Sequence, residues 1–169
     1  MGLINKQVYL ENNYELWKKM FEEEKEKLIK LFTDDNFEIE HVGSTAVEDL
    51  SAKPIVDIAI GVSSFDDFKK YIDKLSNLYT IKENYDNDEI LLINEDKNET
   101  FFLIHVIPIN CIRYKNMITF RNILRTNHDI LKQYEMLKSN LADKYYNNRK
   151  LYTKLKNDFI VKILKNTNN

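Results

Sequence analysis

The spacing of apolar and polar positions divides the chain into a mixed half and a helical half. Apolar residues recur at helical spacing from Tyr14 to Phe32 and again from Phe65 to Leu78. Short apolar runs predict strands at 37–42, 55–62, 79–82, 89–94 and 100–107. Beyond Pro108, helical faces follow at 117–124, 127–145 and 151–164. This order predicts an α+β fold, with a mixed or antiparallel sheet followed by a helical carboxyl-terminal part.

The change of pattern near residue 110 predicts how the chain is organised. We expect residues 1–110 to form an α/β core with an amino-terminal helix, and residues 111–169 to form a helical part. A length of 169 residues suits one domain with a helical appendage. We therefore expect the two parts to pack together as one domain.

Composition and charge narrow the classes of partner. The formal net charge is −2 and the pI is about 6.0, so the chain lacks the overall basic footprint of nucleic-acid binders, although local basic patches stay open. The lone Cys111 excludes an intramolecular disulfide. The amino terminus has no signal-peptide pattern, and no apolar run reaches the roughly 18–20 residues of a membrane span. We expect a soluble, cytoplasmic protein with no membrane partner.

One stretch, HVGSTAVEDLSAKPIVDIAIGV at residues 41–62, holds two of the three glycines and one of the two prolines. Gly43 follows a predicted strand and allows a positive φ, and Ser44 and Thr45 add hydroxyl groups beside free backbone N–H groups. Such a turn can hold a phosphate group. An ordinary glycine turn capped by a serine or threonine is the alternative.

Asp57 is the one charged residue in the apolar run 55–62. Strand alternation places Val56, Ile58 and Ile60 on one face, which we expect to be buried, and Asp57 on the other. Because an unpaired buried carboxylate is costly, Asp57 must lie at an open face, at a cleft or beside a partner. Both a functional and a purely structural role fit these residues.

Two segments carry a resemblance to a known family. EHVGSTAVEDLSAKPIVDIAIGV and FRNILRTNHDILKQYEMLKSNLADKYYNNRKLYTKLKNDFI together resemble the GrpB-like family of nucleotidyltransferase-related proteins, across about residues 14–164. The resemblance implies a nucleotidyltransferase-like, polymerase-β-type fold with a mixed sheet and flanking helices. In that superfamily Gly-Ser after the first strand holds the triphosphate of a nucleoside triphosphate, and carboxylates on the next strand hold Mg²⁺. Gly43 and Ser44 match the first feature, with Thr45 beside them, and Asp57 matches the second.

The chain departs from the superfamily pattern at the second carboxylate. Classical members carry another acid two residues after the first, where this chain has Ala59. The strand predicted at 100–107 has no Asp or Glu and offers His105 instead. Two-metal catalysis needs several carboxylates, which one acid cannot replace. The expectation is therefore a single-metal site for Mg²⁺ or Mn²⁺ (Zn²⁺ also suits such ligands) formed by Asp57 and His105, with Glu40 or His41 as further ligands. A structural role for each histidine stays open.

Four basic residues are predicted to bind phosphate. Lys53 lies in the turn that feeds the Asp57 strand, Arg121 and Arg125 lie four apart on one helix face, and Lys156 lies on the last helix. Arginine binds phosphate oxygens in pairs, and lysine supplies a point charge. The alternative is that all four belong to a solvated surface.

Three hypotheses for the function follow. The first is a nucleotidyltransferase that binds a nucleoside triphosphate with a divalent cation, uses Asp57 and His105 as catalytic residues and modifies an unknown acceptor. The second is a catalytically inactive module that binds a nucleotide or another phosphorylated ligand, and Ala59 favours it. The third is a helical interaction protein with an empty, uncharged cleft.

Overall fold

A computed structural model describes residues 3–4, 8–33, 37–84, 88–96 and 99–167. The strands are β1 (Leu3–Ile4), β2 (Glu38–Val42), β3 (Val56–Val62), β4 (Thr80–Asn84), β5 (Glu89–Asp96) and β6 (Glu99–Pro108). The helices are α1 (Tyr14–Leu31), α2 (Phe65–Lys69), α3 (Ile72–Leu75), α4 (Ile112–Thr126), α5 (His128–Lys144) and α6 (Arg149–Thr167), with a short 3₁₀ turn at Ser44–Ala46. Apart from β1, which was not predicted, and the segment from Phe65 to Leu78, the predicted order of helices and strands is confirmed.

One predicted helix is wrong in detail. The segment from Phe65 to Leu78 forms two short helices instead of one. Ser64 caps α2 by accepting a hydrogen bond from the Asp67 backbone N–H at 3.3 Å. The chain then tightens, because the Tyr71 N–H bonds to the Phe68 carbonyl, three residues back, at 3.0 Å. This turn buries both aromatic rings against the sheet.

The strands form a mixed sheet of order β2-β3-β6-β5-β4, with β1 added beside β6. The β3–β6 pair is parallel, and the other pairs are antiparallel. In this register Asp57 stands between Val42 of β2 and Leu103 of β6. Ala59, two residues along β3, stands between Glu40 and His105. Residues opposite one another share a face, so all of these lie on the same side of the sheet.

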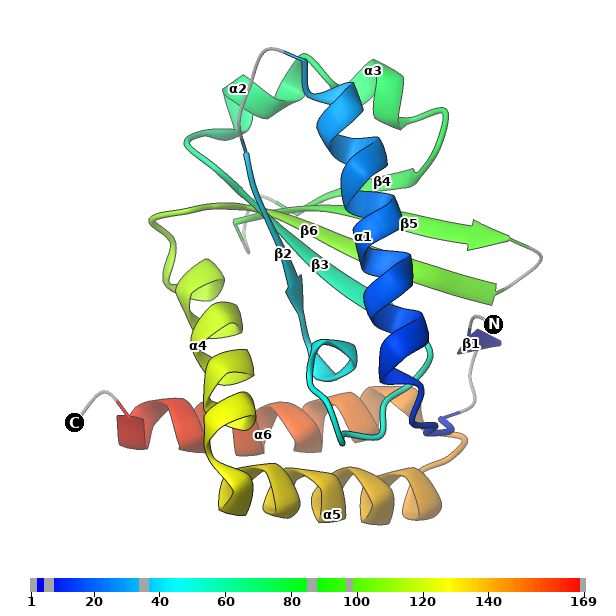
Figure 1. Cartoon of the computed structure of the whole chain (residues 1–169), viewed down its shortest axis with the longest axis vertical. Coiled ribbons are helices and arrows are strands. Elements are labelled where there is room, and N and C mark those ends of the chain that lie inside the picture. The colour runs from blue at the N-terminus through cyan, green and yellow to red at the C-terminus, as the bar shows by residue number, and fades with distance from the viewer. Residues whose placement is uncertain (1–2, 5–7, 34–36, 85–87, 97–98, 168–169) are drawn as a thin grey trace.

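The other face of the sheet carries the main core. Val56, Ile58 and Ile60 are fully buried there, as the alternation predicts, and they pack with Trp17 and Leu28 of α1. Figure 1 shows α1 running across this face, with α2 and α3 near one end of the sheet. The chemistry-bearing side chains of β3 and β6 therefore project away from α1.

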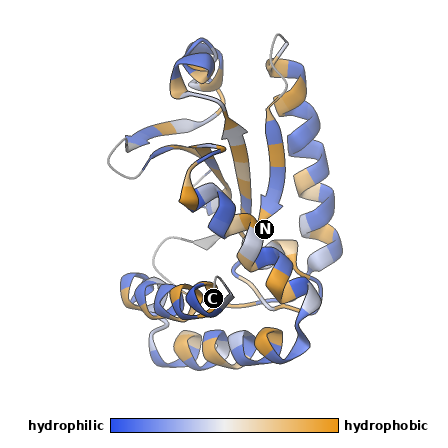
Figure 2. Ribbon diagram, turned by 90° about the vertical axis from the view of Figure 1, so that its left-hand side faces the viewer, coloured by the Kyte–Doolittle hydropathy of each residue, from blue (hydrophilic) through white to orange (hydrophobic). Residues whose placement is uncertain are grey.

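The carboxyl-terminal helices cover the opposite end of the molecule. In Figures 1 and 2, α5 and α6 run side by side below the sheet, and α4 connects them to it. Val47 and Leu50, in the loop after β2, pack with Leu124 of α4, Leu131 of α5 and Ile163 of α6. This cluster fastens the loop to all three helices. None of the helices within the described ranges is long and apolar enough to cross a membrane.

Candidate functional site

The turn after β2 is shaped around the Asp57 side chain. Gly43 has a φ of +73°, a conformation that side-chain-bearing residues rarely adopt. A Cβ at this position would lie 2.5 Å from Oδ2 of Asp57. Glycine is therefore required at residue 43 for two reasons, and it lets the Asp57 carboxylate lie directly against the backbone of the turn.

A cavity of about 170 Å³ opens beside this contact. Its polar lining comes from the turn, from β3 and the segment before it, and from α5 and α6. These residues are Ser44, Thr45, Lys53, Asp57, Lys138, Arg149, Thr153 and Lys156. The turn and the acid predicted from the sequence thus face a common hollow. The helical part of the chain forms its other wall.

Basic groups outnumber acids in this lining. Among the lining residues that the structure describes, Asp57 is the one acid, against four basic side chains. Lys138 is already engaged, because its ammonium group donates to the Ser51 carbonyl and lies 3.2 Å from Glu135. Within the described part of the chain, Lys53, Arg149 and Lys156 have no ion pair within 4 Å. Three cationic side chains are left to face the cavity.

Burial, assisted by neighbouring cations, lowers the pKa of two lysines at the cavity. Burial, together with the charges of Lys156 and Arg149, lowers the pKa of Lys53 to about 7. Burial also lowers the pKa of Lys138 to about 8, although Glu135 opposes the change. A bound anion close to these lysines would favour their charged forms and raise both pKa values.

Behind Asp57 lies a chain of alternating charges. Nε2 of His105 is 3.6 Å from Oδ1 of Asp57, and Nδ1 is 2.5 Å from Oε1 of Glu89. The same Glu89 oxygen accepts a hydrogen bond from Arg113 of α4 at 2.9 Å. The side chains of His105 and Glu89 are only 14% and 9% exposed, whereas that of Asp57 is 31% exposed. The chain of charges therefore runs from the α4 side of the sheet to the cavity.

These contacts fix the protonation states. Burial alone would lower the pKa of His105, but the hydrogen bonds and charges of Asp57 and Glu89 raise it to about 9. Burial alone would raise the pKa of Asp57, but His105, Lys156 and Lys53 hold it below its usual value. At neutral pH an imidazolium lies between two carboxylates.

The position at which the superfamily carries a second acid is occupied by Ala59 in this chain. Ala59 presents no polar group, and its neighbour Glu40 pairs with Arg121 at 2.5 Å. His41 points to the main-core side, where it stacks on Phe21 with ring centroids 4.8 Å apart, and Nε2 lies 3.0 Å from the Thr45 hydroxyl. Burial lowers the pKa of His41 to about 4, so it is neutral. Neither Glu40 nor His41 joins Asp57 at the cavity.

The expected divalent cation finds a poor set of ligands. Among the described residues, no group of three or more His, Cys, Asp and Glu side chains is placed to hold a metal ion. Asp57 and His105 offer two donors, whereas protein zinc sites use three or four. Mg²⁺ can bind through one carboxylate together with substrate phosphates. Here the positive charges of Lys53 and Lys156 already lie near that carboxylate and would repel the cation. The residues present do not fit a resident metal ion.

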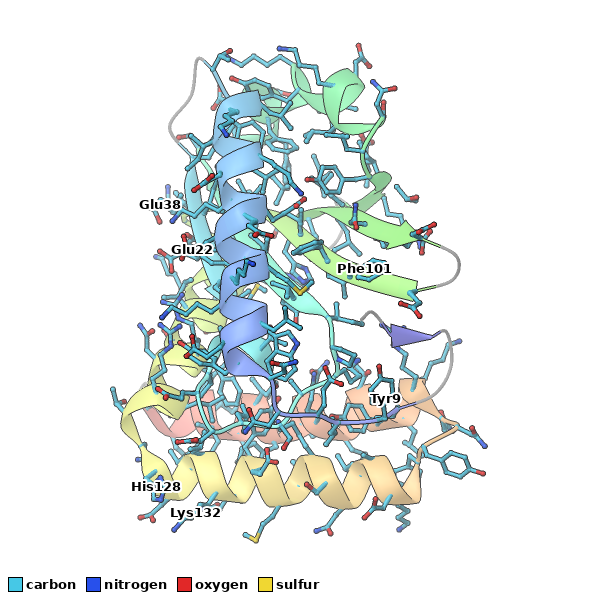
Figure 3. The ribbon with its side chains drawn as sticks, turned by 45° about the vertical axis from the view of Figure 1, so that its right-hand side comes forward. Tyr9, Glu22, Glu38, Phe101, His128 and Lys132 are labelled. Atoms are coloured by element: carbon cyan, nitrogen blue, oxygen red, sulfur yellow. The ribbon has the colours of Figure 1, made fainter. Side chains whose placement is uncertain are left out.

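Of the four basic residues that were predicted to bind phosphate, Arg121 and Arg125 do not line this cavity. Arg121 donates to Glu40 and to the His41 carbonyl, and Arg125 donates twice to the Ala46 carbonyl, at 3.1 and 2.7 Å. Arg125 instead lines a second cavity, together with Glu48, Asp49 and His128. Figure 3 shows His128 at the beginning of α5. Both arginines fasten α4 to β2 and to the turn that follows it.

Several residues of the site were missed in the sequence. Arg149 and Thr153 precede Lys156 by seven and three positions, so helical spacing places all three on one face of α6. Lys138 follows Tyr134 by four and precedes Leu141 by three, so it interrupts a buried apolar stripe. Both patterns are visible in the sequence and could have identified these residues as part of the site. The roles of Glu89 and Arg113 depend on strand register and on the path of α4, which no local pattern reveals.

Comparison with known proteins identifies the family. The model of the GrpB protein family matches residues 7–166. The chain is 32% identical over 170 residues to the glutamate-rich protein GrpB of Alkalihalophilus pseudofirmus, covering 97% of this chain and 98% of that protein. It is 29% identical over 147 residues to the UPF0157 protein YqkA of Bacillus subtilis, covering 86% of this chain but 43% of that protein.

A solved structure supports the same assignment at the level of the fold. The crystal structure of the conserved protein GrpB from Enterococcus faecalis superposes with a TM-score of 0.74 at 23% identity, over 92% of this chain and 99% of that one. The predicted α+β class, with a mixed sheet, flanking helices and a helical carboxyl-terminal part, is confirmed. Because the family model matches most of this chain, the chain belongs to the GrpB protein family.

Proposed function

We propose that this protein binds the phosphate groups of a nucleotide or of a similar phosphorylated ligand in the cavity beside Asp57. One observation carries the proposal: Lys53, Arg149 and Lys156 line the cavity beside Ser44 of the turn, and none of the three has an ion pair among the described residues. Lysine and arginine with hydroxyl donors are the usual partners of phosphate oxygens. The resemblance of the Gly43–Ser44 turn to triphosphate-binding turns supports a nucleotide.

The size of the cavity limits which part of the ligand enters it. Pockets that enclose a whole drug-sized ligand measure roughly 300–1,000 Å³. A cavity of about 170 Å³ suits a phosphate chain better than a complete nucleotide. The base and sugar of a bound nucleotide would then extend beyond the cavity, and selectivity for the base would be weak.

Nucleotidyl transfer is the second candidate, favoured by the contact between Asp57 and the Gly43 turn. In that reaction an acceptor hydroxyl oxygen bonds to the α-phosphorus of a nucleoside triphosphate, pyrophosphate leaves, and the hydroxyl proton passes to a base. His105, Lys156 and Lys53 lower the pKa of Asp57 and keep it ionised, so it can orient the acceptor hydroxyl, but the lowered pKa also makes it a weak base for that proton. The missing acid at Ala59 argues against rapid turnover.

Calorimetric titration with nucleoside di- and triphosphates tests the proposal. Removing a charged hydrogen bond costs about 1.5–3 kcal/mol, so Lys156→Met should weaken binding about tenfold to a hundredfold. Lys162→Met is the matched control, since Lys162 is exposed on the same helix outside the cavity. Equal affinities in both variants would contradict the proposal. Pyrophosphate release that disappears in Asp57→Asn would establish the transfer reaction.

A further inference from the structure

The charges around the cavity raise the question of what neutralises a bound phosphate chain. Enzymes that bind nucleoside triphosphates commonly use Mg²⁺ to offset part of the phosphate charge. Here three basic side chains line the cavity, Lys53, Arg149 and Lys156, and none of them has an ion pair with another described residue. They approach it from two directions, Lys53 from the segment before β3 and the other two from one face of α6.

Lys53 and Lys156 both make a cation–π contact with the Tyr152 ring. The ammonium groups of Lys53 and Lys156 lie 5.7 and 6.0 Å from the centre of the Tyr152 ring, which is 1% exposed. Contact with the π face of a buried ring stabilises the ammonium groups and limits their movement. Both cations are thus held in place before any ligand arrives, which lowers the ordering cost of binding an anion.

The acid that would bind a metal ion is committed elsewhere. Asp57 Oδ2 lies against the Gly43 backbone, and Oδ1 faces Nε2 of His105. Glu89 and Arg113 hold the imidazole from its other side. A cation inserted between Asp57 and His105 would have two protein ligands and would stand near Lys53 and Lys156, which repel it.

We propose that the cavity binds phosphate chains as metal-free anions, with Lys53, Arg149 and Lys156 supplying the positive charge that divalent cations supply in metal-dependent sites. This inference rests on the proposed function and specifies the form in which the ligand binds. The ligand class is a linear di- or triphosphate group that is not complexed by Mg²⁺. Because Mg²⁺ removes two negative charges from the ligand, it competes with the lysines and the arginine.

Calorimetric titration with inorganic triphosphate tests the inference. One titration contains EDTA, and the other contains Mg²⁺ in excess over the triphosphate. We expect binding in EDTA, with affinity several-fold weaker in Mg²⁺. We also expect Lys156→Met to lower the affinity in EDTA by about tenfold or more, and Lys162→Met to leave it unchanged.

The outcomes separate the two proposals. Binding only in the presence of Mg²⁺ would overturn the metal-free mode and leave the phosphate-binding function standing. No binding of triphosphate or nucleotide under either condition would overturn both. Binding in EDTA that is insensitive to Lys156→Met would also overturn the inference, since the anion would then lie outside the cavity. As an independent check, Mn²⁺ alone should produce no binding heat, and Mn²⁺ binding that is lost in Asp57→Asn would contradict the account.

Discussion

The Asp57 carboxylate occupies the space that a side chain at residue 43 would need. The two residues come from neighbouring strand ends, and a Cβ on Gly43 would lie 2.5 Å from Oδ2 and 3.1 Å from Cβ of Asp57. This contact fixes the acid at the edge of the cavity, between the turn on one side and His105 on the other. The geometry of the site therefore depends on a backbone position as much as on charged groups.

Gly43→Ala should impair both stability and binding. The substitution forces a side chain into a left-handed conformation and against a carboxylate, which costs about 1–3 kcal/mol and displaces Asp57. Urea denaturation measures the loss in the free energy of unfolding, and triphosphate titration measures the loss of affinity.

Gly61→Ala is the matched control for this change. A Cβ at residue 61 would lie 2.9 Å from Cζ of the Tyr114 ring. The hydroxyl group of Tyr114 donates a hydrogen bond to Glu38 at 2.9 Å. We expect a similar loss of stability from overpacking, with little change in the affinity of the folded protein, because Gly61 lies four residues along β3 from Asp57 and neither Gly61 nor Tyr114 lines the cavity. If both variants lose affinity equally, the Gly43 effect is not local.

Anion binding should weaken as the pH rises through neutrality. The pKa of Lys53 is lowered to about 7, so the side chain carries its full charge only well below that pH, is half-charged near it and becomes neutral above it. Affinity for triphosphate should therefore fall between about pH 7 and pH 9, beyond any change due to ionisation of the ligand itself. Lys53→Arg keeps its charge throughout and should flatten this part of the profile. Parallel profiles for wild type and Lys53→Arg would assign the pH dependence to another group.

His105 should stabilise the fold most strongly below neutral pH. Its pKa is raised from about 6.5 to about 9 by Asp57 and Glu89, so the folded state retains a proton that the unfolded state loses in this interval. The stabilising contribution is thus complete below about pH 6.5 and disappears as the pH rises through about 9. Its size is on the order of 3 kcal/mol, from the shift of the His105 pKa.

The measurement compares the unfolding free energies of wild type and His105→Gln at several pH values. The difference between the two proteins removes contributions from Lys53 and Lys138, whose titration acts in the opposite direction. We expect the difference to be largest near pH 6 and to shrink towards pH 9. A difference that is constant over this range would show that His105 is not held as an imidazolium.

Arg121 and Arg125 should contribute to stability rather than to binding at the Asp57 cavity. Arg121→Met leaves Glu40 and the His41 carbonyl without their donor, at a cost of about 1–3 kcal/mol. We expect the folded variant to bind triphosphate with unchanged affinity, in contrast to Lys156→Met. A large loss of affinity without loss of stability would instead support the phosphate-binding role that the sequence suggested.

The sequence predicted the α+β architecture well because its strands alternate clearly. Val56, Ile58 and Ile60 are buried on the α1 face, and Asp57 lies on the other, as expected. It failed where local turns decide the outcome, as at Tyr71, where the predicted helix divides. The two-residue strand β1 is too short to produce any pattern.

The site was predicted only as far as local motifs reach. Gly43, Asp57 and His105 were proposed as site residues because the motifs that resemble the GrpB-like family fall on short local segments, whereas the residue pattern alone left their roles open. Glu89 reaches His105 through a strand register, and Arg149 reaches the cavity through the packing of α6, so both depend on tertiary structure. Arg121 and Arg125 are basic, as a phosphate site requires, but their side chains do not point into the Asp57 cavity. They donate to the His41 carbonyl of β2 and to the Ala46 carbonyl instead.

A crystal structure of the protein soaked with a nucleoside triphosphate in the presence of EDTA tests the central claim most directly. The account predicts density for the phosphate chain between the Ser44 turn, Lys53 and Lys156. Phosphate density in the second cavity beside Arg125, or an unchanged Asp57 cavity at a saturating ligand concentration, would contradict it.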